Sequence, residues 1–309
     1  MPTNPLQVLV VRDGRPGHEK QTLGIVAALE RRRTVRHAEI SLQPGISALL
    51  TAASVLMGLR LGVADTFFPD VIIGTGSHTH LTVLALKNRL GGRAVTCMTP
   101  GRLLRPWFDL CFVPRHDEIT EGGNILLTDG PPGLNVNLRQ HDPSQGLILV
   151  GGVDEKSHVW DNTEMARRVA STISRYPHLS WTLTTSPRTP AAFLDAFGKT
   201  SEKISVRLCP FGETPPGWLE QALNRSKYVV VTEDSMSMIF EALSAGCRVG
   251  TIPVDFKKNN KFVRSLDELK TRNLLEADFN TMELGGSERD FDVAGQCAAE
   301  MEKRWWPND

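Results

Sequence analysis

The stretch from Tyr228 to Gly246 constrains the fold more than any other part of the chain. Residues 229–231 are three consecutive valines, and such a run is typical of a strand buried on both faces of a parallel sheet. A polar turn at 232–237 follows, and an apolar helix then runs to a glycine stop. The pattern predicts a polar turn at the carboxyl end of a parallel strand, facing a helix N-terminus. Open α/β sheets bind phosphate groups at such turns.

The same turn has a simpler interpretation as a helix cap. Asp234 or Ser235 offers a side-chain oxygen that can cap the following helix, and such turns occur in every α/β protein. Capping needs one oxygen, whereas Asp234, Ser235 and Ser237 present several, which favours a ligand. The turn has no glycine-rich cradle, and no G-x-G-x-x-G follows any predicted strand, so neither a P-loop nor a dinucleotide fingerprint is predicted.

Strands and helices alternate through both halves of the chain. Predicted strands lie at 6–12, 35–42, 69–74, 93–98, 108–113, 125–127, 146–150, 180–185, 204–209, 228–231 and 248–253. This alternation predicts an α/β fold of two facing Rossmann-like parallel-sheet domains with an interdomain cleft. The predicted domains are 1–140 and 141–290, joined by the polar linker 133–145, and we expect the terminal helix 291–309 to pack back toward the first domain.

Composition excludes several classes of protein. Lys plus Arg and Asp plus Glu number 35 each, which argues against a nucleic-acid partner. The five cysteines are widely spaced without a C-x-x-C, which favours a reducing compartment and argues against a structural metal. The N-terminus lacks the charged and apolar regions of a signal peptide. We therefore expect a cytoplasmic protein, with attachment to the inner face of a membrane as an alternative.

That alternative rests on the apolar segment from Ile46 to Leu61. The segment is too short to span a bilayer, and the simplest interpretation is a helix packed on the sheet. Residues Leu49, Leu50, Met57 and Leu61, together with Arg60, also fit a contact with a membrane surface.

Loops at the carboxyl ends of the second-half strands are rich in groups that bind phosphates and sugars. Glycines let a backbone approach a ligand closely, Arg188 suits a forked contact with a phosphate, and Phe211 offers an aromatic face to a base. Ordinary turn chemistry is the alternative. The predicted nucleotide-sugar site comprises Gly151, Gly152, Thr185, Ser186, Arg188, Phe211, Glu233, Asp234, Ser235, Met236, Ser237 and Glu241.

Two of these residues have a spacing known from enzymes. Glu233 and Glu241 are separated by seven residues, as in the E-x7-E element of many retaining glycosyltransferases. In this interpretation Glu241 accepts hydrogen bonds from ribose hydroxyls, while the backbone of 234–237 meets the diphosphate.

In the first half, the loop from Asp13 to His18 is the candidate catalytic segment. Gly14 and Gly17 shape a tight turn that presents Asp13 and His18, either of which suits a general base toward an acceptor hydroxyl. The alternative is structural: Asp13 hydrogen-bonds the turn and His18 caps the helix.

A second loop, with Ser77 and His78, completes the predicted acceptor side, together with Gly14 and Gly17. His78 and His80 diverge at a helix start, so we predict no metal site and expect Ser77 to cap the helix. No cofactor is predicted beyond the nucleotide-sugar substrate.

Two motifs resemble a known family. They are Asp13-Gly14-Arg15-Pro16-Gly17-His18 with Gln21, and Thr232-x-Asp234-Ser235-x-Ser237-Met238. Together they resemble the mitochondrial fission ("elongated mitochondria") family and its bacterial relatives, from the first strand through Pro253.

The resemblance implies a glycosyltransferase B-type fold in which the C-terminal domain holds a nucleotide-sugar. Bacterial members of the family are labelled as predicted nucleoside-diphosphate-sugar epimerases, and the eukaryotic member recruits a dynamin-related protein to the mitochondrial surface. The family pattern does not fix an acidic residue at Glu233, whereas Asp234, Ser235 and Glu241 lie on the shared motif.

Three functions are compatible with these observations. The leading one is transfer of a sugar from a nucleoside-diphosphate donor to an acceptor, with lipid-linked acceptors among the candidates. Ser235, Ser237, Arg188 and the helix N-terminus would stabilise the leaving diphosphate. The alternatives are a nucleoside-diphosphate-sugar 2-epimerase, and a non-catalytic scaffold that recruits a protein partner at a membrane surface.

Overall fold

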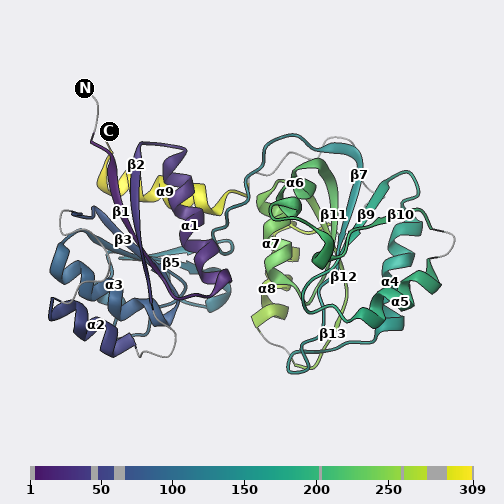
Figure 1. Cartoon of the computed structure of the whole chain (residues 1–309), viewed down its shortest axis with the longest axis horizontal. Helices are drawn as coiled ribbons and strands as arrows, with labels where there is room; N and C mark the ends of the chain where they lie inside the picture. Colours follow the sequence, from purple (N-terminus) through teal and green to yellow (C-terminus); the bar gives the residue numbers. More distant parts are fainter. Residues whose placement is uncertain are drawn as a thin grey trace. The chain divides into compact units, whose positions relative to one another are not determined.

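The chain divides into two compact units. The computed structural model describes residues 4–42, 48–58, 67–201, 204–258, 261–276 and 291–307. Unit 1 comprises Met1–Leu134 with Asp292–Asp309, and unit 2 comprises Asn135–Phe291 (Figure 1). The division precedes the predicted residue 140 because the linker attaches to unit 2. There the Asn135 amide donates to the Glu241 carbonyl at 3.3 Å, and the Leu138 N–H donates to Asn224 Oδ1 at 2.9 Å.

Unit 1 contains a parallel six-stranded sheet in the order β2-β1-β3-β4-β5-β6. Its central strands are almost wholly apolar because helices cover both faces of the sheet. The strands are β1 (Leu6–Arg12), β2 (Val35–Ser41), β3 (Val71–Thr75), β4 (Arg93–Cys97), β5 (Leu110–Pro114) and β6 (Ile125–Thr128). The helices are α1 (Pro16–Glu30), α2 (Ala48–Leu56), α3 (Ser77–Leu90) and α9 (Val293–Trp305), with short 3-10 turns η1 (Arg105–Trp107) and η2 (Arg115–Asp117).

The terminal helix α9 packs against α1 in unit 1 (Figure 1). Asp292 caps it by accepting from the Gly295 N–H at 2.7 Å, and Asp292 also pairs with Arg31 at 3.2 Å. At its other end the Trp305 and Trp306 rings lie 5.0 Å from the guanidinium groups of Arg93 and Arg33, respectively. These cation–π contacts dock the end of the helix on unit 1.

Unit 2 contains a parallel five-stranded sheet in the order β10-β9-β7-β11-β12. Its strands are β7 (Asp142–Leu149), β9 (Ser180–Thr184), β10 (Val206–Leu208), β11 (Ser226–Thr232) and β12 (Arg248–Ile252). Its helices are α4 (Asn162–Arg175), α5 (Ala191–Thr200), α6 (Trp218–Arg225), α7 (Met236–Ser244) and α8 (Lys261–Thr271), with the 3-10 turn η3 (Phe211–Glu213). A separate antiparallel ribbon joins β8 (His158–Val159) to β13 (Asp255–Phe256). The predicted α/β class with two parallel sheets is confirmed.

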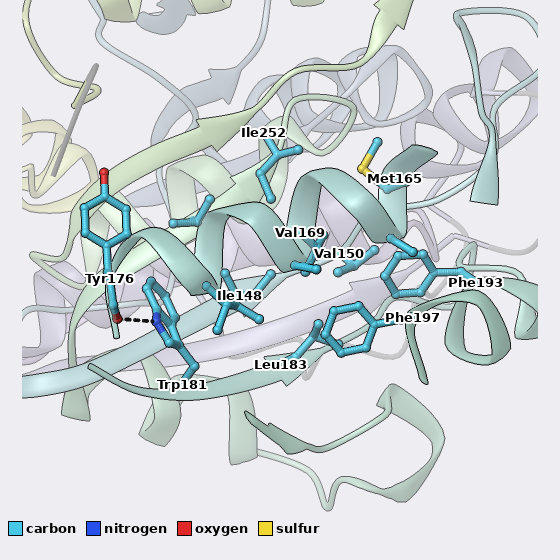
Figure 2. Packing of buried hydrophobic residues seen from close by; sticks show 14 of the residues in the cluster. Ile148, Val150, Met165, Val169, Tyr176, Trp181, Leu183, Phe193, Phe197 and Ile252 are labelled. Atoms are coloured by element: carbon cyan, nitrogen blue, oxygen red, sulfur yellow. Dashed lines mark hydrogen bonds between the residues drawn. The ribbon is translucent and has the colours of Figure 1, made fainter. Parts of the chain in front are cut away.

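The core of unit 2 fixes the position of the strand ends. Ile148 of β7 and the adjoining Val150 pack with α4 and α5, where Phe193 and Phe197 stack at 6.0 Å (Figure 2). The indole of Trp181 donates to the Tyr176 carbonyl at 3.1 Å, so this buried polar atom is satisfied. The apolar packing holds the carboxyl ends of β7, β9 and β11 in register.

The apolar segment predicted at 46–61 is described only at 48–58, where it forms α2; Ile46, Arg60 and Leu61 lie outside the described residues. Within the described ranges, no helix is both long and apolar enough to cross a bilayer.

Candidate functional site

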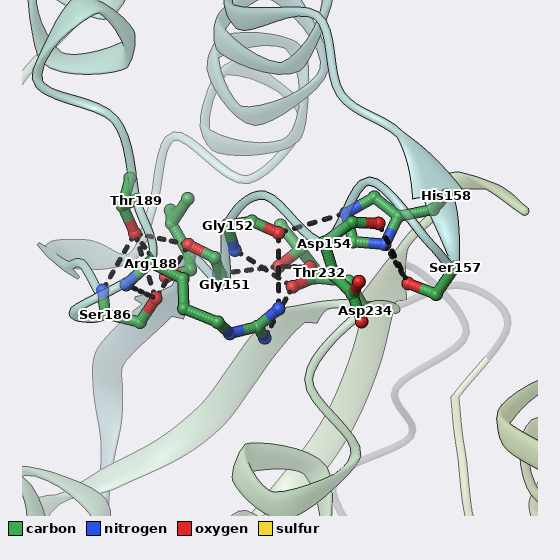
Figure 3. A network of polar contacts seen from close by, with 11 residues as sticks. Gly151, Gly152, Asp154, Ser157, His158, Ser186, Arg188, Thr189, Thr232 and Asp234 are labelled. Atoms are coloured by element: carbon green, nitrogen blue, oxygen red, sulfur yellow. Dashed lines mark hydrogen bonds and ion pairs between the residues drawn. The ribbon is translucent and has the colours of Figure 1, made fainter.

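Three loops of unit 2 meet around the carboxylate of Asp234 (Figure 3). They follow β7, β9 and β11, which are neighbours in the sheet. The Asp234 side chain is fully buried, with 0% exposure. Its Oδ1 accepts from the Thr232 hydroxyl at 2.6 Å, and its Oδ2 accepts from the Gly152 N–H at 2.9 Å and from Arg188 Nη2 at 3.0 Å. A buried carboxylate with this many donors is a fixed structural centre rather than a mobile surface group.

The two glycines after β7 allow this close packing of the loops. A Cβ atom on Gly151 would lie 2.1 Å from Asp234 Oδ2, and one on Gly152 would lie 2.1 Å from the Arg188 carbonyl oxygen. Sequence reasoning assigned these glycines to close approach by a ligand. The structure gives them a different role, because other loops of the protein already occupy that space.

The N-terminus of α7 has no side-chain cap from the residues predicted to provide one. Ser235 occupies the N-cap position but makes no side-chain capping bond, and the Asp234 carboxylate is directed at Gly152, Thr232 and Arg188. The prediction that Asp234 or Ser235 caps this helix is therefore wrong. Ser235 and Met236 are buried while Ser237 is exposed, so the first turn of α7 borders solvent with its positive dipole end uncapped by these side chains.

Two residues outside the predicted site, His158 and Thr189, hold these loops through bonds to backbone carbonyls. His158 is 2% exposed; its Nε2 lies 3.0 Å from the Gly152 carbonyl oxygen and its Nδ1 lies 2.7 Å from Ser157 Oγ. Because a carbonyl only accepts, Nε2 carries the proton and the Ser157 hydroxyl donates to Nδ1. Thr189 Oγ1 donates to the Val150 carbonyl at 3.1 Å. His158 lies at the far end of the loop after the predicted strand 146–150, and nothing in the local sequence indicates that its ring bonds to Gly152.

Arg188 combines a fixed inner contact with an exposed outer edge. Its Nη2 bonds to Asp234, and its Nη1 lies 3.5 Å from the Gly152 carbonyl oxygen, yet the side chain is 42% exposed. A guanidinium carries five N–H donors in a planar fork. The edge that faces solvent therefore retains donors suited to a phosphate.

The loop after β10 contacts the loop after β9 and offers an aromatic surface. Phe211 is 54% exposed, and its N–H donates to Thr185 Oγ1 at 3.1 Å. Ser186 Oγ donates to the Gly151 carbonyl at 2.9 Å. Thr185 and Ser186 are thus engaged in holding the loops, whereas Phe211 presents its ring outward.

The two glutamates of the E-x7-E spacing have different surroundings. Glu233 is 7% exposed, and its carboxylate accepts from Thr251 Oγ1 and Lys270 Nζ, both at 2.9 Å. It is thus bonded to β12 and α8. Glu241 is half-buried on α7.

In unit 1, Asp13 and His18 form a hydrogen-bonded pair. Asp13 Oδ2 lies 2.8 Å from His18 Nδ1, and the Asp13 side chain is only 2% exposed. Asp13 Oδ1 also accepts from the Arg15 N–H at 3.1 Å, so the expected bond to the turn is present. A carboxylate on Nδ1 orients the imidazole and leaves Nε2 as the nitrogen that can exchange a proton with a substrate.

The loop after β3 meets this pair. A Cβ on Gly76 would lie 2.4 Å from the His18 ring, and Gly76 has a φ of 88°. Both the close approach of the ring and the positive φ therefore disfavour a side chain at this position. Gly76 is also the N-cap of α3 and Ser77 makes no capping bond, so the prediction that Ser77 caps this helix is wrong. Ser77 and His78 are exposed, as are Gly14 and Gly17.

Comparison with known proteins decides the family. Residues 16–305 match the sequence profile of the family described as Mitochondrial fission ELM1. The chain belongs to this family. A comparison with curated proteins found no match.

Solved structures with a similar fold include nucleotide-sugar enzymes. A predicted UDP-N-acetylglucosamine 2-epimerase from Listeria monocytogenes has a TM-score of 0.63 at 13% identity, covering 99% of this chain and 98% of that chain. S. aureus MnaA in complex with UDP has a TM-score of 0.56 at 12% identity, with 98% and 97% covered. Acinetobacter baumannii MurG has a TM-score of 0.53 at 12% identity, with 97% and 92% covered. At these identities the likeness shows the fold, which is the glycosyltransferase B type.

The ELM1-family chain also buries a histidine beside the Asp13–His18 pair. His80 is 3% exposed and lies edge-on to Phe108 at 5.5 Å. Burial, with a smaller effect of nearby His18, lowers the pKa of His80 to about 4. Because an unfolded histidine has a pKa of about 6.5, the unfolded chain binds a proton between these values that the folded chain does not. Stability from this group is full above about pH 6.5 and falls as the pH falls toward 4.

On acidification from about pH 7 to about pH 5, we expect His80 to lower the free energy of unfolding by about 2 kcal/mol, because only the unfolded chain takes up a proton there. The measurement is urea unfolding at both pH values for the wild-type chain and for His80→Leu, which removes the buried titratable group. The Leu variant should lose less stability on acidification, whereas the control variant His178→Leu, at an exposed histidine, should behave as the wild type. An equal loss in His80→Leu and the wild type would rule out His80 as the group.

Among the residues that the structure describes, no group of three or more His, Cys, Asp or Glu side chains is placed to hold a metal ion.

Proposed function

We propose that this chain binds a nucleoside-diphosphate-sugar at the loops of unit 2 and transfers the sugar to an acceptor. The observation that carries the proposal is the Arg188–Asp234 pair beside the N-terminus of α7. Arg188 is anchored on a buried carboxylate at 3.0 Å while its side chain stays 42% exposed. This arrangement supplies a positioned cation next to a helix N-terminus, and both favour phosphate.

Charge balance supports this placement of the diphosphate. The buried Asp234 carboxylate alone would repel an anion, but Arg188 neutralises it from the side that faces solvent. The exposed Ser237 hydroxyl and the first-turn N–H groups of α7 add donors that do not need to desolvate a further charge. During transfer the same groups would stabilise the charge that develops on the leaving diphosphate.

Neighbouring residues suit the rest of the nucleotide. The Phe211 ring, 54% exposed, offers a face on which a base can stack. The half-buried Glu241 lies on α7, where its carboxylate would accept from ribose hydroxyls. Glu233 takes no direct part in this proposal, since its carboxylate is bonded to Thr251 and Lys270.

The acceptor side of the proposal rests on unit 1. The Asp13–His18 pair, at 2.8 Å, has the arrangement of an oriented general base, so His18 would take the proton from the acceptor hydroxyl as the sugar is transferred. The exposed Ser77 and His78 are proposed to bind polar groups of the acceptor, and a lipid-linked molecule is the acceptor class that we propose.

A second reaction, epimerisation at C2 of a nucleotide-sugar, is favoured by the fold neighbours. One similar structure is the predicted UDP-N-acetylglucosamine 2-epimerase from L. monocytogenes. Another is the UDP-GlcNAc 2-epimerase from Neisseria meningitidis bound to UDP-GlcNAc. Incubation of the substrate in deuterated water separates the reactions: epimerisation introduces deuterium at C2, and transfer does not.

Thermal unfolding with and without nucleotides tests the proposed binding site. A ligand at a hundred times its Kd stabilises the folded chain by about 2.7 kcal/mol, which should raise Tm by roughly 5 °C or more. We expect this rise with at least one of UDP, ADP, GDP or TDP or their sugars. Arg188→Ala should remove it, whereas Arg207→Ala, at an exposed arginine of β10, should not. If no diphosphate nucleotide raises Tm at millimolar concentration, the proposed site does not exist.

A further inference from the structure

One face of unit 1 carries large apolar side chains in contact with solvent. Leu49, Leu50 and Leu56 of α2 and the adjoining Met57 are 68%, 65%, 56% and 74% exposed. Their spacing places them on one side of the helix. The opposite side, with Ala52 and Val55, is buried in a core cluster that also contains Val83 and Leu86 of α3. The helix therefore has one apolar side that packs in the core and a second apolar side that does not.

A second group of exposed apolar residues adjoins the same core cluster. Leu103 is 86% exposed and Trp107 is 68% exposed, both in the segment between β4 and β5. The adjoining Phe108 belongs to the core cluster that also contains Val55 of α2 and Leu86 of α3. The two exposed groups thus flank the same core cluster.

Helix α3 joins the two groups. Arg89 Nη1 donates to the Val55 carbonyl of α2 at 3.1 Å, and Lys87 Nζ donates to the Trp107 carbonyl at 3.1 Å. Figure 1 shows α2 and α3 side by side. We call the face formed by residues 48–58, 77–90 and 99–108 the α2–α3 face.

The three segments of the α2–α3 face are net basic. They contain no Asp or Glu, although the whole chain has equal numbers of acidic and basic residues, 35 each. They contain Lys87, Arg89, Arg102 and Arg105. Of these, Arg102 is exposed, and Lys87 pairs with Asp109 at 2.7 Å.

We propose that the α2–α3 face docks on an anionic lipid bilayer. Exposed Leu, Met and Trp side chains enter the boundary between headgroups and acyl chains, and Trp favours that depth. Arginine and lysine beside them are attracted to anionic headgroups. Grouped apolar side chains of this size are unusual on a monomeric protein surface. The described helices are too short to span a bilayer, so the contact is peripheral.

Charge argues against a second copy of the chain as the occupant. A two-fold dimer through this face would bring the same basic residues opposite each other, with no acidic partner from the face itself. An anionic lipid surface supplies the opposite charge. The docking surface is independent of the nucleotide site in unit 2, and only the lipid-linked nature of the acceptor connects it to the proposed sugar transfer.

Sedimentation with lipid vesicles tests the proposal on the full chain. We expect binding to phosphatidylcholine vesicles that contain phosphatidylglycerol and much weaker binding to phosphatidylcholine alone. The double variant Leu49→Ser, Leu50→Ser should weaken binding at least about tenfold, because two side chains no longer enter the bilayer. Trp107→Ser, in the second exposed group, should also weaken vesicle binding. Arg102→Glu should weaken binding roughly tenfold through charge alone.

Matched controls separate docking from folding. Val159→Ser and Leu208→Ser change exposed apolar residues of unit 2, 55% and 43% exposed, and should bind vesicles as the wild type does. All variants should keep the wild-type Tm, and because no step of this test uses a nucleotide, failure of the nucleotide site leaves it intact. Absence of vesicle binding, binding indifferent to phosphatidylglycerol, or equal loss in the controls overturns the proposal. A wild-type dimer that Leu49→Ser, Leu50→Ser converts to a monomer assigns the face to self-association instead.

Discussion

Asp234→Ala is expected to lower the free energy of unfolding by about 2–4 kcal/mol, because it leaves buried hydrogen-bond donors without their acceptor. The carboxylate is fully buried and accepts bonds from Thr232, Gly152 and Arg188. After the substitution a buried hydroxyl and a buried N–H lose their acceptor, and Arg188 loses its anchor. The variant should also lose nucleotide protection, since the guanidinium is no longer fixed beside α7.

Two further variants make the result specific. Asp234→Asn keeps the shape and an acceptor oxygen for Gly152 and Arg188, so it should cost about 1–2 kcal/mol. Asp255→Ala removes a carboxylate that is 73% exposed and 3.6 Å from Arg168, and it should change stability by less than about 1 kcal/mol. Urea unfolding of the three variants ranks their losses of unfolding free energy. A cost for Asp234→Ala no larger than that for Asp255→Ala would show that the buried network does not stabilise unit 2.

The layout of the sheets could be predicted from the sequence because buried parallel strands leave a local signal. Strand β11 is buried on both faces, and the three consecutive valines at 229–231 indicate this in the sequence. The ribbon of β8 and β13 leaves no such signal, because it pairs only two residues from each of two distant segments. Helix α8 was also missed.

The loops of the candidate site could be predicted, but not the bonds within them. Carboxyl ends of neighbouring parallel strands share an edge, so the loops after β7, β9 and β11 were expected together. The contacts of Asp234 with Arg188 and Gly152 join residues 46 and 82 positions apart. Sequence near Asp234 favours a helix cap, and the long-range ion pair prevails because Arg188 gives a charge-assisted bond in a buried site.

The unit boundary illustrates the same limit. Composition identified the polar segment 133–145 as a linker, yet Asn135 and Leu138 are bonded to α7 and α6 of unit 2. Asparagine is frequent in loops, and nothing local distinguishes an asparagine in a free linker from one bonded to a distant carbonyl.

Gly152→Ala is expected to destabilise the chain by about 3 kcal/mol, at the upper end of overpacking costs, and to lower Tm by roughly 10 °C. The new Cβ would lie 2.1 Å from the Arg188 carbonyl oxygen and 2.5 Å from the Thr189 nitrogen. Both are backbone atoms, so no change of rotamer relieves the contact. The loop that carries Arg188 must move away, which also breaks the 3.1 Å bond from the Val153 N–H to the Arg188 carbonyl.

Gly212→Ala is the matched control, because Gly212 lies in a neighbouring loop and a Cβ there meets nothing within 4 Å. Its Tm and nucleotide shift should equal those of the wild type. In Gly152→Ala the nucleotide shift should fall with Tm, because displacement of Arg188 removes the proposed phosphate contact. Retention of the full shift at a lowered Tm would separate the two effects and show that the nucleotide does not use Arg188. An unchanged Tm would mean that the two loops do not pack as closely as these distances require.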